Sequence, residues 1–142
     1  MIAMNTELYN KHVLQGDAPV LVEYWAPWCV YCRRIVPALE KVARQREDVI
    51  VAQVNIDQEP ELARREQIEV IPTLVLYRDG KALGSIVAPE SKAMIETFLQ
   101  EKLSSRKKDI EAIYKPCYNA FDNKQQGGNN YEICMRRLRM GI

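Results

Sequence analysis

The feature that most constrains the fold is an apolar run, VLVEYWA (residues 20–26), that leads through two cysteines into a helical pattern. The run is rich in β-branched and aromatic residues and barely alternates, which is typical of a strand buried on both faces of a parallel sheet. After the cysteines, apolar residues recur at helical spacing, at Ile35, Val36, Leu39, Val42 and Ala43. The sequence therefore predicts an α/β domain with Cys29 and Cys32 at a strand-to-helix junction.

The rest of residues 1–104 supplies the other layers of such a domain. Further strands are predicted near the N-terminus, at 49–57 and within 73–87, and further helices at 5–16, 60–68 and 91–103. The run at 73–87 is divided by Asp79-Gly80, a strong signal for a β-hairpin. Helical crossovers join parallel strands, whereas a hairpin adds antiparallel ones. We therefore expect a mixed sheet with helices on both faces.

A second segment, residues 105–142, follows this domain of residues 1–104. Apolar residues return to helical spacing on both sides of QQGGNN (residues 125–130), so we expect a short helical hairpin. Cys117 and Cys134 would face each other across that turn, and they form either a structural disulfide or two buried thiols. The role of this C-terminal extension stays open.

Composition excludes several classes of function. The chain has 142 residues, 47% of them hydrophobic and 27% charged, and its net charge of +1 lacks the basic excess of a nucleic-acid-binding protein. No apolar run reaches the roughly 18 residues that cross a bilayer, and the N-terminus lacks the pattern of a signal peptide. We therefore expect a cytoplasmic protein with no membrane or nucleic-acid partner. In that reducing compartment a close pair of cysteines is typically catalytic or metal-binding.

Cys29 and Cys32 have the spacing of a redox-active dithiol. Cys29 would lie at the N-terminus of the helix, where unpaired N–H groups and the helix dipole favour the thiolate that attacks disulfides. Cys32, one turn later, would resolve the mixed disulfide formed at Cys29. Half of a zinc site, a structural disulfide without turnover and inert thiols are the alternatives. We expect no metal, because zinc needs four ligands and only the distant Cys117, Cys134 and His12 could complete the set.

The runs VLVEYWAPWCVYCRRIVPALEKVA and VNIDQEPELARREQIEVIPTLVLYRDGK make the chain resemble the thioredoxin family over residues 5–104. The resemblance implies the thioredoxin fold without a bound cofactor, with Cys29 as the nucleophile and Cys32 as the resolving thiol. It also implies that Trp28 lies beside the nucleophile and that Ile71 offers its backbone to an extended substrate segment. Pro72 would face the cysteines after a cis peptide bond; the alternative is a trans proline at a strand edge.

Glu23 interrupts the apolar run where both faces of the strand should be buried. Burying an unpaired carboxylate is so costly that such a group usually becomes protonated instead, through a raised pKa. A neutral acid near Cys32 would give and take the proton that disulfide exchange requires. The alternative is a side chain that points to solvent at an exposed edge. Thioredoxins usually have Asp here and often Lys at the position of Gln53, so this chain departs from the family at both places.

The dipeptide between the cysteines is Val30-Tyr31, whereas thioredoxins usually have Gly-Pro there. Without proline the start of the helix is less preorganised, and Arg33 and Arg34 favour the thiolate together with the helix dipole. We therefore hypothesise a more oxidising couple than that of a typical reducing thioredoxin. A buried acid nearby acts in the opposite direction.

The predicted function is thiol–disulfide oxidoreduction on protein disulfides, with electrons from an external reductase or thiol pool. We expect the protein to act as a monomer. The alternative function is that of a thioredoxin-like binding module, which turns over slowly and holds a specific partner through its C-terminal extension.

Overall fold

The computed structural model describes residues 1–104 of the chain. The predicted helical hairpin of residues 105–142, with Cys117 and Cys134, lies outside the described residues and stays a prediction. In the described part, no helix is long and apolar enough to cross a membrane.

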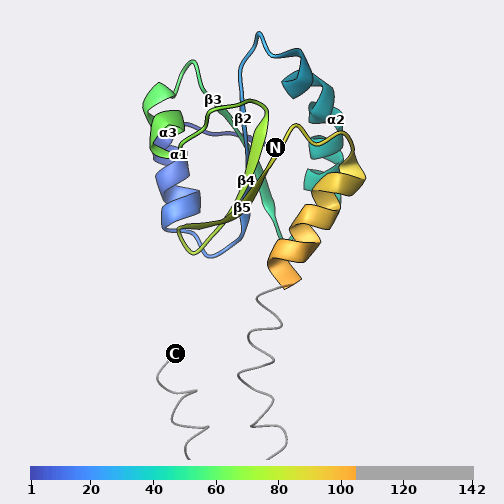
Figure 1. The fold of residues 1–142 in the computed structure, drawn as a ribbon. Helices are drawn as coiled ribbons and strands as arrows, with labels where there is room; N and C mark the ends of the chain where they lie inside the picture. The colour runs from blue at the N-terminus through green and yellow to red at the C-terminus, as the bar shows by residue number, and fades with distance from the viewer. Residues whose placement is uncertain (105–142) are drawn as a thin grey trace, which may run out of the picture. The chain divides into compact units, whose positions relative to one another are not determined.

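A five-stranded mixed sheet forms the centre of the domain (Figure 1). Its strands, in the order in which they pair, are β1 (Ile2–Ala3), β3 (Ile50–Asn55), β2 (Val20–Trp25), β4 (Thr73–Arg78) and β5 (Lys81–Val87). The first three run parallel, while β4 is antiparallel to β2 and to β5. Asp79 and Gly80 have φ values of 52° and 76°, the left-handed conformation that the tight turn between β4 and β5 needs. The predicted mixed sheet is confirmed.

Helices cover both faces of this sheet. Those of the described residues are α1 (Thr6–Tyr9), which continues as a wider turn over Asn10–Leu14, α2 (Val30–Gln45), α3 (Pro60–Arg65) and a last helix over residues 92–104. Figure 1 shows α1 and α3 on one face, and α2 with the last helix on the other. The predicted α/β architecture is therefore confirmed.

The central strand, β2, sends alternate side chains into the two helical layers. Val22 and Tyr24 belong to the buried cluster that includes Tyr9 of α1 and Leu62 of α3. Because successive side chains of a strand point to opposite faces, Glu23 lies on the α2 side. The strand thus carries a carboxyl group into the layer that holds α2.

On the other face, Tyr24 joins a chain of buried polar contacts. Its hydroxyl lies 2.8 Å from the hydroxyl of Tyr77 on β4, and Tyr77 donates to the Glu66 carboxylate, at the end of α3, over 3.0 Å. Buried hydroxyl groups are costly without a partner, so these contacts satisfy both tyrosines and link β2, β4 and α3. Nothing in the apolar pattern of β2 predicts this link.

Candidate active site

The two cysteines lie where β2 passes into α2. After the strand the chain turns, and the Cys29 N–H donates to the Ala26 carbonyl over 3.1 Å. Cys29 is the N-cap residue of α2, with extended backbone angles, and its Sγ accepts the N–H of Cys32 at 3.1 Å. The sulfur occupies the place that a side-chain oxygen takes at many helix N-termini, where N–H groups and the helix dipole stabilise negative charge.

Cys29 and Cys32 are joined as a disulfide, with their Cα atoms 5.3 Å apart. The exposed fraction is 7% for Cys29 and 1% for Cys32, so only Cys29 is accessible to another protein. A two-step disulfide exchange needs this difference in exposure, because an accessible thiol attacks the substrate and a buried neighbouring thiol then releases it. Within residues 1–104, no three His, Cys, Asp or Glu side chains gather as metal ligands would, and the zinc-site alternative finds no support there.

Glu23 is fully buried, so the alternative of a side chain pointing to solvent is wrong. Its Oε2 accepts a hydrogen bond of 2.6 Å from the side-chain amide of Gln53, the residue directly opposite on β3. Its Oε1 has no hydrogen-bond partner among residues 1–104. Burial raises the pKa of the Glu23 carboxyl from 4.5 to about 7, and the Gln53 hydrogen bond offsets part of that rise. The sequence predicted a buried acid at Glu23 but not its hydrogen bond to Gln53. Parallel pairing of the two consecutive buried strands could have placed these two residues opposite each other.

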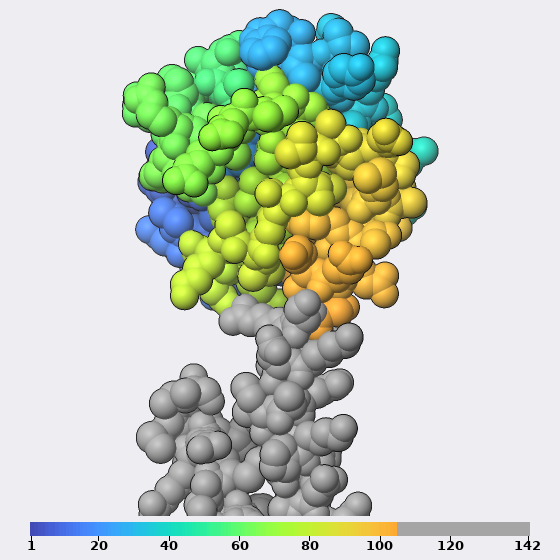
Figure 2. Space-filling view, viewed as in Figure 1, coloured from blue at the N-terminus to red at the C-terminus, as the bar shows by residue number. Residues whose placement is uncertain are grey.

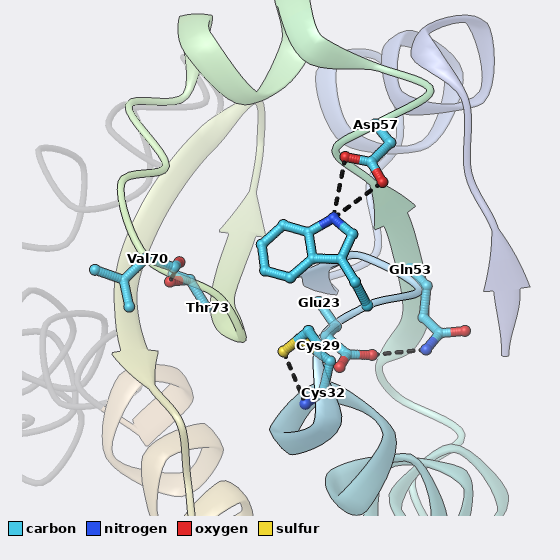
Figure 3. Close-up of a disulfide and its surroundings, with 8 residues drawn as sticks. Glu23, Cys29, Cys32, Gln53, Asp57, Val70 and Thr73 are labelled. Carbon is cyan, nitrogen blue, oxygen red and sulfur yellow. Dashed lines mark hydrogen bonds between the residues drawn. A yellow bond between two sulfur atoms is a disulfide. The ribbon is translucent and has the colours of Figure 1, made fainter.

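Figure 3 shows how this carboxyl is oriented. One oxygen points toward Gln53, and the unpaired one lies toward the end of α2 that carries Cys29 and Cys32. The acid is thus on the same side of the sheet as the cysteines, as a proton donor and acceptor for them requires.

Trp28, next to Cys29, forms a side-chain hydrogen bond that the sequence pattern did not predict. The indole Nε1–H donates to the Asp57 carboxylate, 3.2 Å from Oδ2, although 66% of the residue is exposed. The Asp57 backbone N–H in turn donates to the Asn55 side chain at 2.9 Å. Because β2 and β3 are parallel and Trp25 pairs with Asn55, both loops leave the sheet at the same edge, and that topology is the signal that could have found Asp57.

The segment between α3 and β4 lies across from this site. Figure 3 places Val70 and Thr73 on one side of the cysteine pair and Gln53 on the other. The peptide bond between Ile71 and Pro72 is cis, the form that the resemblance implies. The segment is fixed at both ends, since the Thr73 hydroxyl donates to the Val70 carbonyl and the Pro72 carbonyl accepts the Ala88 N–H at 2.9 Å.

Large apolar side chains are exposed beside the cysteines and on this facing segment. The exposed fractions are 66% for Trp28, 64% for Tyr31, 54% for Val70 and 49% for Val30. Such a group of exposed apolar residues around a reactive sulfur is typical of a surface that binds another protein. The resemblance named only Trp28 among them. The first two positions of a capped helix are commonly exposed, so Val30 and Tyr31 could have been found from the position of Cys29 alone.

Comparison with known proteins agrees with this geometry. The sequence model of the family described as Thioredoxin matches residues 1–101. Thioredoxin 1 of Synechococcus elongatus is 34% identical over 102 residues, which cover 71% of this chain and 95% of the relative. Thioredoxin of Mycobacterium tuberculosis is 43% identical over 88 residues, or 61% of this chain and 76% of the relative. Thioredoxin of Alicyclobacillus acidocaldarius is 37% identical over 99 residues, or 69% of this chain and 94% of the relative.

The family match spans every strand of the sheet and ends before the predicted C-terminal extension. It includes the disulfide at the start of α2 and the proline after the cis bond. Fold, dithiol and sequence similarity therefore lead to the same conclusion: the chain belongs to the thioredoxin family of thiol–disulfide oxidoreductases.

Proposed function

We propose that this chain exchanges disulfides with protein substrates through Cys29 and Cys32, and that Glu23 handles the proton of the second step. The observation that carries the proposal is the position of Cys29, an N-cap sulfur that is slightly exposed, one turn before a buried second sulfur. In the reduced protein, the Cys29 thiolate attacks one sulfur of the substrate. The substrate S–S bond breaks, its other sulfur leaves as a thiolate and takes a proton, and a mixed disulfide remains.

The second step releases the substrate. The Glu23 carboxylate takes the proton of the Cys32 thiol, and the Cys32 thiolate attacks the Cys29 sulfur. The mixed disulfide breaks, and the second substrate sulfur leaves and is protonated. The substrate has gained two electrons and two protons, and the chain is left with the Cys29–Cys32 disulfide. An external reductase or thiol pool then restores the dithiol.

The geometry of Glu23 supports this role. A pKa of about 7 makes the carboxyl comparably ready to accept and to release a proton near neutral pH. Gln53 binds one oxygen, and the other, on the side of the cysteines, accepts no hydrogen bond from any residue that the structure describes. Trp28, Ile71 and Pro72 would form the face on which the substrate lies, and the backbone of Ile71 would pair with an extended substrate segment.

Reduction of insulin disulfides tests the proposal directly. The native protein, supplied with a dithiol reductant, should reduce insulin over many turnovers, and Cys29→Ser should abolish this activity. Cys32→Ser should instead accumulate a mixed disulfide with the substrate, because attack proceeds and resolution does not. Negligible turnover by the native protein would overturn the enzymatic proposal and favour a binding module. The cytoplasmic location and the monomeric state remain predictions from the sequence.

A further inference from the structure

Two arginines follow the cysteines on α2. Arg33 and Arg34 are both exposed, and neither forms an ion pair with a carboxylate of residues 1–104. No acidic residue stands three or four positions away from either of them along the helix, the spacing at which α-helical side chains meet. Within the described part of the chain, two positive charges in the second turn of the helix thus have no ion-pair partner.

Both arginines lie near Cys29 at the start of α2. Arg33 is one turn after Cys29, and its backbone N–H donates to the Cys29 carbonyl at 3.4 Å. Helical side chains lean toward the N-terminus, which brings a long side chain such as that of Arg33 toward the sulfur. The Arg34 guanidinium lies over the exposed ring of Tyr31, 5.3 Å from its centroid. This contact keeps the second charge at the rim of the apolar surface.

The side of Cys29 away from the arginines carries Trp28 and Asp57. There the Asp57 carboxylate is already occupied by the Trp28 indole. The indole is neutral, so the Asp57 carboxylate keeps its negative charge. The surface beside the reactive sulfur, blue in Figure 2, is therefore apolar in the middle, at Trp28, Val30 and Tyr31. It is negative on the side of Asp57 and positive toward the second turn of α2. A partner that matches it carries apolar residues next to its disulfide and carboxylates on the side that meets the second turn of α2.

We propose that Arg33 and Arg34 give this enzyme a preference for protein disulfides with Asp or Glu within a few residues of the cystine. The inference rests on the proposed function and adds a substrate class to it. Charges at the rim of an interface act mainly by steering association, so the preference should show in kcat/KM and should weaken as salt screens it. The arginines are specificity-determining residues in this account and do not take part in the exchange itself.

Two cyclic disulfide peptides of equal length test the proposal, identical except for Glu in one and Lys in the other on both sides of the cystine. The reduced full-length protein should reduce the Glu peptide about fivefold faster at about 0.01 M salt, and this ratio should approach unity at about 1 M salt. In the Arg33→Glu/Arg34→Glu double variant the ratio should invert. Lys41→Glu is the matched control, since it changes the charge of the same helix about two turns farther from Cys29 and should leave the ratio unchanged.

Each failure has a separate meaning. Equal rates for the two peptides with the native protein would overturn the proposed preference, while reduction of insulin would leave the enzymatic function in place. A double variant that slows both peptides by the same factor would also overturn it, because the arginines would then act on the thiolate and not on the substrate. If the double variant does not fold, Arg33→Gln/Arg34→Gln should remove the preference without inverting it, and an unchanged ratio in that variant would count against the proposal.

Discussion

Gln53 donates a hydrogen bond from its side-chain amide to Glu23 across the β2–β3 pair, 2.6 Å from one carboxyl oxygen, and the other oxygen has no partner among the described residues. A neutral amide gives the acid one hydrogen bond and no charge. The pKa of Glu23 is therefore set mainly by burial, which raises it to about 7. The chemistry and the pH dependence of this protein should both follow from this pair.

The buried acid should make the oxidised protein less stable as pH rises. The carboxyl has a pKa of about 7 when folded and 4.5 ordinarily, so both states are protonated below pH 4.5. Between these values the unfolded state loses the proton first, and the free energy of unfolding falls by about 3 kcal/mol in total before it levels off above pH 7. Glu23→Gln lacks this titration. Urea unfolding of both proteins from about pH 4 to about pH 8 measures the difference; a difference that stays constant over this range would contradict the raised pKa.

Two substitutions at Gln53 should move the titration in opposite directions. Gln53→Leu removes the hydrogen bond that holds the Glu23 pKa down, so the pKa should rise above its native value. Gln53→Lys brings a cation to the same oxygen and should lower it. The rate of substrate release from the mixed disulfide, followed by stopped flow, should rise with pH through an inflection that shifts accordingly. Two variants that change stability but share the native inflection would show that Gln53 has only a structural role.

The contact between Trp28 and Asp57 should matter for binding more than for folding. Asp57→Ala frees the exposed indole, so KM for insulin should rise about two- to fivefold, as expected for the loss of an exposed charge-assisted contact worth about 1 kcal/mol or less. Asp57→Asn keeps an acceptor and should show a smaller change. The urea midpoint should stay close to that of the native protein in both variants. Unchanged steady-state kinetics in Asp57→Ala would mean that the orientation of the indole is unimportant to the substrate.

The reduction potential should lie above that of an ordinary thioredoxin. Val30-Tyr31 stands where thioredoxins usually have Gly-Pro, so the helix start lacks the proline that preorganises it. Titration against glutathione measures the potential, and replacing Val30-Tyr31 by Gly-Pro should lower it. A native potential at or below that of ordinary thioredoxins would refute the hypothesis.

Much of this fold could be predicted because each helix and strand can be recognised from its own stretch of sequence. The run before Trp25 has too little alternation for a half-exposed strand, and Asp79-Gly80 marks its hairpin without reference to the rest of the chain. The cysteine pair could be placed for the same reason, since a strand followed at once by a helical pattern puts Cys29 at a helix N-terminus.

What could not be predicted depends on contacts between distant segments. A continuous apolar run does not show on which face of the sheet each side chain lies. The contact between the hydroxyl groups of Tyr24 and Tyr77 could therefore not be predicted from the sequence pattern. The role of Asp57 required knowing that β3 lies beside β2. Glu23 was recognisable as an oddity in its strand, whereas its hydrogen bond to Gln53 needed the pairing of the two strands.

The alternation of Glu23 and Tyr24 along β2 also has a consequence for assembly of the sheet. Each polar group finds its partner on a different neighbouring strand, Gln53 on β3 and Tyr77 on β4. A slip of one residue would exchange the two faces, leaving the carboxyl among the aromatic rings and the phenol under α2, both without partners. A sheet with β2 in the wrong register would thus lose stability at its pairing with both β3 and β4. The same acid that we assign to proton transfer therefore helps to select the native register.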